Sequence, residues 1–281
     1  MKQMIKVEGL KIRHYRRDSH IDAVKEISFS VDEGEFISVC GLNGSGKTSL
    51  LSALNGLIPH FYKSRMKGRV TVAGLDTKEH TVAELSRSIG FVFDNPFNQI
   101  SYTTETVRHE IAFGLCNLNI KPSVIEKQVE ETAELVGITH LLDRSPLALS
   151  GGQLQRIAIA SVIVMKPNII MLDDCTSQLD PLGSQEIFKV IERLRSRGMT
   201  IICVDHDIER VCTYADKILL LSKGELKAYG TPRDVLSDPS MREYGLKTHD
   251  SYEIAKILYE NGIKNAKGCL TYHDLKQGIA G

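Results

Sequence analysis

The sequence predicts an α/β fold with a largely parallel sheet, and three observations lead to that prediction. Short runs rich in valine and isoleucine alternate with stretches of helix length. A glycine-rich loop at 41–48 stands between one such run and a helix-like segment. The segment 123–137 consists almost entirely of good helix formers. Continuous apolar runs between helices are typical of strands that are covered on both faces.

Six runs have the length and composition of strands: Glu35–Cys40, Arg69–Ala73, Ile89–Phe93, Asn168–Asp173, Thr200–Val204 and Lys217–Leu221. Between Asn95 and Gln155 the pattern changes to that of a helical insert. Within it we expect a helix over 123–137, with Ser123 as its N-cap and Gly137 as its stop.

The end of the chain reads differently from the rest. After Gly230 the segment TPRDVLSDPS breaks the α/β pattern, and the last forty residues carry no strand signal. Short helices, such as one over Ser251–Glu260, are the only elements that we expect there. We interpret this part as a small C-terminal appendage.

Composition excludes several classes of protein. The 281 residues, 42% of them hydrophobic, suffice for a sizeable core. Thirty-five basic side chains balance thirty-five acidic ones, so no overall field attracts nucleic acid, and we expect no nucleic-acid partner. The six cysteines are scattered without a CxxC pair, which favours a reducing cytosol. No export signal is visible and the apolar runs are far shorter than the ~20 residues of a membrane span, so any membrane connection is expected through a partner.

The glycine-rich loop matches the pattern GxxxxGK[ST] in the strand-to-helix context that this motif requires. Its glycines allow backbone N–H groups to surround phosphate oxygens, and the following helix adds the positive end of its dipole. A lysine then faces the outer phosphates, and a threonine hydroxyl binds Mg²⁺. The loop therefore predicts ATP and Mg²⁺ as cofactors, bound by Gly41, Leu42, Asn43, Gly44, Ser45, Gly46, Lys47, Thr48 and Ser49.

A second candidate element is the apolar run 169–172, which ends in Asp173 and Asp174. Ligands of α/β proteins bind at the carboxyl ends of strands. We expect Asp173 to hold Mg²⁺ and Asp174 to orient the water that attacks the phosphate. An apolar strand that ends in two carboxylates is common, so a solvated strand end remains the alternative for this element alone.

The string Leu149-Ser150-Gly151-Gly152-Gln153, followed by LQR, resembles the signature motif of ABC (ATP-binding cassette) ATPases. It begins a helix-like stretch, so the serine and the two glycines would offer a hydroxyl, backbone N–H groups and a positive helix end to a phosphate. Other elements of the family follow in the expected order. Tyr15 resembles the aromatic residue that stacks on adenine, Asp94 begins the Q-loop segment, Ser177–Asp180 resembles the D-loop and His206 the switch histidine.

The resemblance implies an ABC-type P-loop NTPase with a RecA-like core, a helical signature subdomain and a small C-terminal appendage. It covers the chain from Ile5 to about Pro232. The expected division places the first part of the core at 1–94, the helical subdomain at 95–156, the second part of the core at 157–232 and the appendage at 233–281. The catalytic residues that the resemblance implies are Lys47, Asp174 and His206, and Mg²⁺ would be held by Thr48, Asp173 and Asp94.

In this family two cassettes enclose two nucleotides head to tail, each site pairing the P-loop of one chain with the signature of the other. Within the family, the strings LNGLIPHFY, FDNPFNQI and EIAFGLCNL resemble the ATPases of energy-coupling factor transporters, which take up vitamins and metal ions. This branch implies a second ABC ATPase, a transmembrane coupling subunit and a substrate-binding membrane subunit as partners. It also implies a peripheral location on the cytoplasmic face of the cell membrane.

Three positions depart from the family pattern. Asp174 stands where a glutamate is usual, Asp94 where a glutamine is usual, and Cys175 where a proline is usual. Aspartate is one methylene shorter than glutamate, and a misplacement of ~1 Å can cost ~10²-fold in rate. Our hypothesis is that this chain's own P-loop site turns over slowly, while its intact signature completes a competent site on a different cassette. The alternative is that Asp174 still serves, with a compensating shift of the backbone.

Three other functions stay open on the sequence alone. An exporter ATPase shares the nucleotide motifs but is commonly fused to its membrane segments. A non-transport ABC protein that acts on DNA or ribosomes normally shows a long coiled-coil insert, zinc cysteines or tandem cassettes. A regulatory nucleotide-binding cassette without turnover follows if the three departures are taken literally.

Overall fold

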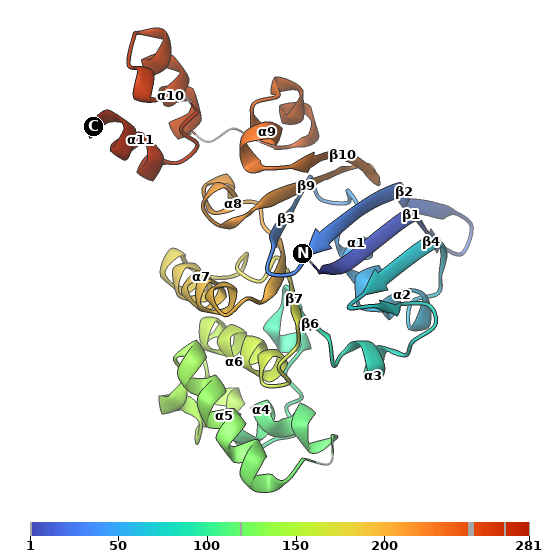
Figure 1. Ribbon diagram of the computed structural model, residues 1–281. Helices are drawn as coiled ribbons and strands as arrows, with labels where there is room; N and C mark the ends of the chain where they lie inside the picture. The colour runs from blue at the N-terminus through green and yellow to red at the C-terminus, as the bar shows by residue number, and fades with distance from the viewer. Residues whose placement is uncertain (1, 119, 247–249, 267, 281) are drawn as a thin grey trace.

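The computed structural model describes residues 2–118, 120–246, 250–266 and 268–280. Two sheets and a set of helices form the molecule (Figure 1). The strands are β1 Gln3–Tyr15, β2 His20–Asp32, β3 Phe36–Cys40, β4 Ser64–Val72, β5 Leu75–Asp76, β6 Ile89–Val92, β7 Ile169–Asp173, β8 Thr200–Val204, β9 Lys217–Ser222 and β10 Glu225–Gly230. The helices are α1 Lys47–Leu54, α2 Leu57–His60, α3 Val82–Leu85, α4 Val107–Cys116, α5 Pro122–Val136, α6 Gly151–Ile163, α7 Pro181–Ser196, α8 Ile208–Tyr214, α9 Pro232–Leu236, α10 Asp250–Glu260 and α11 Tyr272–Ala280.

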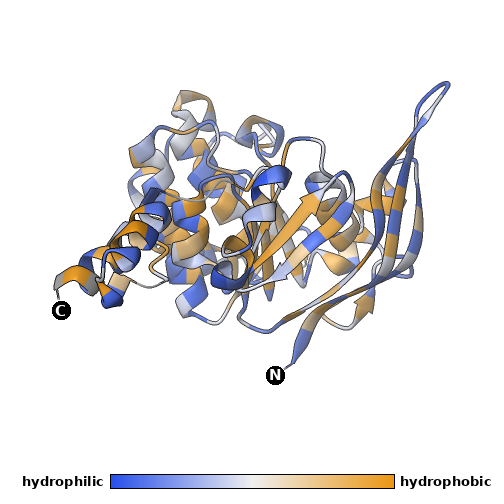
Figure 2. Ribbon diagram, turned by 90° about the horizontal axis from the view of Figure 1, so that it is seen from above, coloured by the Kyte–Doolittle hydropathy of each residue, from blue (hydrophilic) through white to orange (hydrophobic). Residues whose placement is uncertain are grey.

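The central sheet has the strand order β10-β9-β3-β8-β7-β6, with only the edge strand β10 antiparallel to its neighbour. Every residue of β3, β7 and β8 is buried, because layers on both faces exclude water. One face packs on α6 and α7, and the other on α1 and the second sheet. Figure 2 shows these hydrophobic strands inside the molecule. Five of the six predicted strands belong to this sheet and are confirmed.

The second sheet is antiparallel, with the order β2-β1-β4-β5, and only its strand β4 was among the predicted strands. In β1 apolar residues such as Leu10 and Ile12 are fully buried, while polar residues between them face outward. This alternation is that of a sheet with one face on the core and one face in water. The sheet covers α1 and so forms one wall beside the glycine-rich loop.

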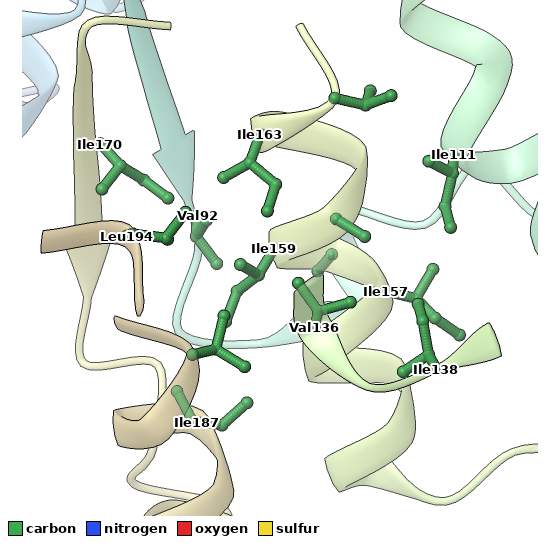
Figure 3. Packing of buried hydrophobic residues seen from close by; sticks show 14 of the residues in the cluster. Val92, Ile111, Val136, Ile138, Ile157, Ile159, Ile163, Ile170, Ile187 and Leu194 are labelled. Atoms are coloured by element: carbon green, nitrogen blue, oxygen red, sulfur yellow. The ribbon is translucent and has the colours of Figure 1, made fainter. Parts of the chain in front are cut away.

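Helices α4, α5 and α6, which come between β6 and β7 in the sequence, pack against one another. Their shared core includes Ile111, Val136 and Ile157, which lie close together in Figure 3. Gly137 ends α5 in the left-handed conformation, as predicted, with φ 72°. The prediction of Ser123 as the N-cap is wrong. Lys121 occupies that position and Pro122 begins the helix, because the fixed φ of proline suits the first turn and its missing N–H is not needed there.

Beyond β10 the chain forms only helices and turns among the described residues. Helix α9 begins at a Thr231 cap, and Arg242 forms an ion pair with Glu253 that links the following turn to α10. Residues 247–249, 267 and 281 of the predicted appendage lie outside the described part of the chain. Within the part that is described, no helix combines the length and apolarity that crossing a bilayer requires. The division of the chain into four segments stays a prediction.

Candidate functional site

The candidate site is a cavity of about 530 Å³ at the carboxyl ends of the central strands. The chain leaves β3 into the glycine-rich loop, β6 toward Asp94, β7 at the paired aspartates and β8 toward His206. Because these strands are parallel, their ends meet at one edge of the sheet. The cavity is lined by His14, Ile21, Ala23, Asn43, Gly44, Gly46, Lys47, Thr48, Ser49, Asp94, Asp173, Asp174, Val204 and His206.

The glycine-rich loop leaves the start of helix α1 open. Gly46 is the N-cap residue, in the left-handed region with φ 109°, and no side chain caps the helix. A Cβ atom at this position would lie 2.2 Å from the carbonyl oxygen of Ala23, so only glycine fits. The first N–H groups of a helix have no partner within the helix and carry its positive dipole. This arrangement suits a bound anion.

Lys47 holds a buried positive charge beside that helix start. Its Nζ donates to the carbonyl oxygens of Gly41, at 2.7 Å, and Leu42, at 3.0 Å. Burial lowers the pKa of Lys47, and the nearby carboxylate of Asp174 opposes that effect. The buried Ser45 Oγ has no hydrogen-bond partner among the described residues. A cation held by neutral carbonyls and an unpaired hydroxyl both fit the phosphates of ATP.

The carboxylates on the opposite side of the cavity fit a divalent cation. Burial raises the pKa of Asp173, a hydrogen bond from Thr48 lowers it, and the charges of Asp94 and Asp174 raise it. Mg²⁺ is usually held by one or two carboxylates together with substrate phosphates and water. Accordingly, the described residues contain no group of three or more acidic, histidine or cysteine side chains that would hold a metal alone. Thr48, Asp173 and Asp94 fit Mg²⁺ that arrives with a nucleotide.

Asp174 and His206 lie close together in the lining of the cavity. Asp174 follows β7 with a left-handed backbone, φ 53°, and its Oδ2 lies 3.8 Å from Nε2 of His206. Burial raises the pKa of Asp174, whereas the His206 side chain lowers it and Asp205 raises it. Ser177 Oγ donates to the main-chain oxygen of Asp174 at 2.9 Å, which ties the next loop to this position.

The structure places Tyr15 outside the residues that line the cavity. Tyr15 is the last residue of β1 and its side chain is 56% exposed. Its neighbour His14 lines the cavity instead, together with Ile21 and Ala23 of β2, and none of these three was predicted. The signal for His14 was present, because it follows the buried Leu10 and Ile12 at the inward positions of the strand.

The signature residues form a separate surface. Ser150 caps α6 in a capping box, in which Gln153 N donates to Ser150 Oγ at 3.4 Å and Ser150 N donates to Gln153 Oε1 at 3.0 Å. Nothing lies within 4 Å of a Cβ built on Gly151. The tip of α6 is therefore open to another molecule. None of the residues 149–153 lines the cavity of the same chain.

The D-loop residue Asp180 caps the neighbouring helix. Its carboxylate accepts a hydrogen bond from Gly183 N at 2.6 Å at the start of α7. The preceding Leu179 lies against the signature, since its Cδ2 would be 3.8 Å from a Cβ on Gly152. The two predicted elements therefore lie side by side.

The parallel sheet, the open helix start and the buried lysine define a P-loop nucleotide-binding cassette. A family model described as "ABC transporter" matches residues 24–177, more than half of the chain. The chain belongs to this family, and it is an ATPase with ATP and Mg²⁺ as its ligands, coupled to transport.

Relatives and solved structures agree with this assignment. The energy-coupling factor transporter ATP-binding protein EcfA1 of Bacillus subtilis is 38% identical over 276 residues, 97% of this chain and 95% of its own length. A putative ABC transporter ATP-binding protein of Pyrococcus horikoshii is 41% identical over 247 residues, 88% of this chain and 92% of its own. The structure of cbiO1 from Clostridium perfringens, described as part of the ABC transporter complex cbiONQ, has a TM-score of 0.74 at 32% identity and covers 86% of this chain and 93% of its own.

A dimeric cassette bound to ADP and Pi, MJ0796, is a further structural neighbour. It has a TM-score of 0.71 at 26% identity, and the match covers 82% of this chain and 99% of the neighbour. The likeness to a cassette solved with ADP and Pi agrees with the fit of the cavity to a nucleotide.

Proposed function

We propose that this chain is the ATP-hydrolysing subunit of an energy-coupling factor importer, which energises uptake of a vitamin or a metal ion through membrane partners. The observation that carries the proposal is the similarity to EcfA1, which extends over 97% of the chain and so includes the C-terminal appendage. The location that follows is peripheral, on the cytoplasmic face of the cell membrane. An exporter ATPase subunit and a regulatory cassette without turnover are the competing functions.

Purification of the intact complex from its own cells tests the proposal. We expect the tagged chain to bring with it a second, different ABC ATPase, a transmembrane coupling subunit and a small substrate-binding membrane protein, each identified by mass spectrometry. Recovery with a membrane protein that has no separate substrate-binding subunit would favour the exporter. A complex that binds MgATP but does not hydrolyse it would favour the regulatory cassette.

We propose a role for each site residue, and the arrangement of the cavity lining supports these roles. Mg²⁺, when it is bound with the nucleotide, would supply positive charge that offsets the negative charge developing on the phosphates. Lys47 moves from the loop carbonyls to phosphate oxygens, while Thr48, Asp173 and Asp94 hold the ion. His206 donates a hydrogen bond toward the terminal phosphate, and Asp174 orients the attacking water. We assign Tyr15 to the adenine side, where its exposed ring is free to stack.

The other half of the site comes from a partner cassette. The open tip of α6, with Ser150 and Gly151, is placed against the nucleotide of that partner, and Asp180 lies beside it at the junction. Enclosure from both sides surrounds the terminal phosphate with fixed donors, which stabilise the transition state better than water does. A single chain therefore hydrolyses ATP poorly.

We further propose that the chain's own P-loop site turns over slowly because of Asp174. Its carboxylate lies at the cavity wall near His206, one methylene short of the reach of a glutamate. Replacing Asp174 with Glu is expected to raise turnover at this site about tenfold or more, since a displacement of ~1 Å costs ~10²-fold. Turnover at this site is measured as phosphate release by the complex of this chain with its partner cassette, in which the partner's own P-loop is inactivated. An unchanged rate in Asp174→Glu would contradict the proposal, and Asp174→Asn serves as the control without a carboxylate.

This chain has a groove of about 280 Å³ beside the segment that follows β6, and the groove is a candidate docking site for the membrane partner. Its lining is mostly apolar and includes Leu57, Phe91, Phe93, Val162 and Met165. An apolar groove between helices suits an amphipathic helix of a partner. We propose that a short helix of the transmembrane subunit occupies it.

A charge in this groove is expected to break the complex. Met165→Glu would bury a carboxylate against the partner helix, which should lower recovery of the membrane subunits about tenfold or more. Val124→Glu, an exposed position of α5 outside the groove, is the matched control. Quantitative mass spectrometry of the purified complex measures recovery, and MgATP binding by each free variant should equal wild type. Equal recovery from both variants would place the docking site elsewhere.

A further inference from the structure

His14 connects the antiparallel sheet to the phosphate-binding loop. It lies on β1 directly opposite Ser64 of β4, and its Nδ1 is 2.7 Å from Ser64 Oγ. On the other side its Nε2 is 2.8 Å from Ser49 Oγ, in the first turn of α1. Both His14 and Ser49 line the nucleotide cavity, whereas Ser64 does not. The imidazole thus bridges two elements that are far apart in the sequence.

Partial burial lowers the pKa of His14, which favours the neutral form of the ring. A neutral imidazole has one N–H donor and one acceptor nitrogen. If Nε2 carries the proton, it donates to Ser49 Oγ, and Nδ1 accepts from the hydroxyl of Ser64. The hydroxyl proton of Ser49 is then free to point into the cavity. In the other tautomer Ser49 donates to the ring and has no proton left for a ligand.

We propose that His14 is a positioning residue for nucleotide binding, which acts through a relay from Ser64 to His14 to Ser49. The inference rests on the proposed role of this cavity in binding ATP. In the relay each hydroxyl donates in one direction, so that Ser49 presents its proton to an anionic phosphate oxygen. Hydrogen bonds aligned in this way strengthen one another. The ligand class that gains from it is a phosphate-bearing nucleotide.

Loss of the ring is expected to weaken nucleotide binding more than catalysis. His14→Ala should raise the Kd of MgATP for the full chain about fivefold, the effect of one well-placed hydrogen bond. In the assembled pair, KM for ATP should rise with little change in kcat, because the contact exists in ground and transition states alike. His14→Gln keeps an amide donor toward Ser49 and should restore most of the affinity.

A double-mutant cycle separates the relay from a purely structural contact. Ser64→Ala should weaken MgATP binding in the wild-type background but have no further effect in His14→Ala, since Ser64 reaches the cavity only through the ring. Ser28→Ala is the matched control. Ser28 lies in the same sheet, and its hydroxyl accepts a hydrogen bond from Gly9 N at 2.9 Å away from the cavity.

Isothermal titration of MgATP into each folded variant, with thermal unfolding of the same samples, decides the outcome. If wild type binds MgATP and both His14→Ala and Ser64→Ala bind it equally well, the relay is overturned and the proposed function stands. If wild type itself binds no MgATP, the proposed function fails as well. If His14→Ala does not fold, Ser64→Ala compared with Ser28→Ala carries the test. Nitrogen chemical shifts of the ring that show the proton on Nδ1 would also overturn the relay.

Discussion

Replacing Lys47 with alanine is expected to weaken MgATP binding to this chain by roughly a hundredfold or more. The structure holds the Lys47 ammonium inside the cavity on two carbonyl oxygens, at 2.7 and 3.0 Å, and leaves it 8% exposed. A phosphate is a far better partner than a carbonyl for a buried cation. Two hydrogen bonds to a charged group, each contributing about 1.5–3 kcal/mol, amount to about 3 kcal/mol or more. That energy corresponds to two powers of ten in Kd.

Titration calorimetry of the full chain measures this effect directly. Lys189→Ala is a suitable control, because that lysine is exposed on α7 and pairs with a neighbouring glutamate, Glu186, at 2.7 Å. Thermal unfolding without nucleotide establishes that both variants are folded. Retention of wild-type affinity by a folded Lys47→Ala chain would show that the nucleotide does not lie along this loop.

Replacing Gly151 with arginine is expected to leave binding by the chain intact but to lower turnover of the assembled pair by ~10²-fold or more. Gly151 lies at the open tip of α6, where an added Cβ has no atom of the described residues within 4 Å. The chain should therefore fold normally. The long side chain would occupy the space of the partner's nucleotide and remove the donors on one side of its phosphate. Loss of a single donor to a developing negative charge typically costs 10²–10³-fold.

Measuring both turnover by the complex and nucleotide binding by the free chain distinguishes this outcome from a defect in folding. Val124→Arg adds the same side chain at an exposed position of α5 in the same helical region, and should keep full turnover. Steady-state phosphate release by the complex reports turnover, while calorimetry of the free chain reports binding. Normal turnover by the Gly151→Arg pair would mean that the signature does not complete a site on the partner.

The parts of the fold that the sequence predicted are those in which local pattern and burial agree. The runs at 36–40, 169–173 and 200–204 are buried on both sides, so they consist mostly of apolar residues and stand out from their surroundings. The start of α1 was predictable for a related reason. Only glycine fits the close approach and left-handed backbone at Gly46, so the glycine in the sequence itself indicates this backbone conformation.

The antiparallel sheet was less predictable because one of its faces is in water. Strand β1 mixes buried Ile12 with exposed Lys11 and partly exposed Arg13, and its register shifts interrupt the alternation. At α5 the serine that was predicted as the N-cap lies inside the helix. The helix begins at the proline one residue earlier, since proline fixes the backbone of the first turn. Local propensity ranked the two residues in the wrong order.

The candidate site shows the same division. Asp173 was predicted from its place at a strand end, and Asp94 and His206 from the family resemblance; the three meet because the parallel sheet brings strand ends to one edge. His14 reaches the cavity from the other sheet, and only the packing of that sheet on α1 places it there. The alternation along β1 marks His14 as an inward-facing residue, but it does not show which distant element the side chain meets.

The central claim is that MgATP is held on one side by the P-loop of this chain and on the other by the signature of a second cassette. Counting MgATP bound to the assembled pair, by equilibrium dialysis at saturating nucleotide, tests it most directly. We predict two nucleotides per pair for wild type and one when this chain carries Lys47→Ala. A wild-type pair that binds none, or a Lys47→Ala pair that still binds two with unchanged affinity, would contradict the account.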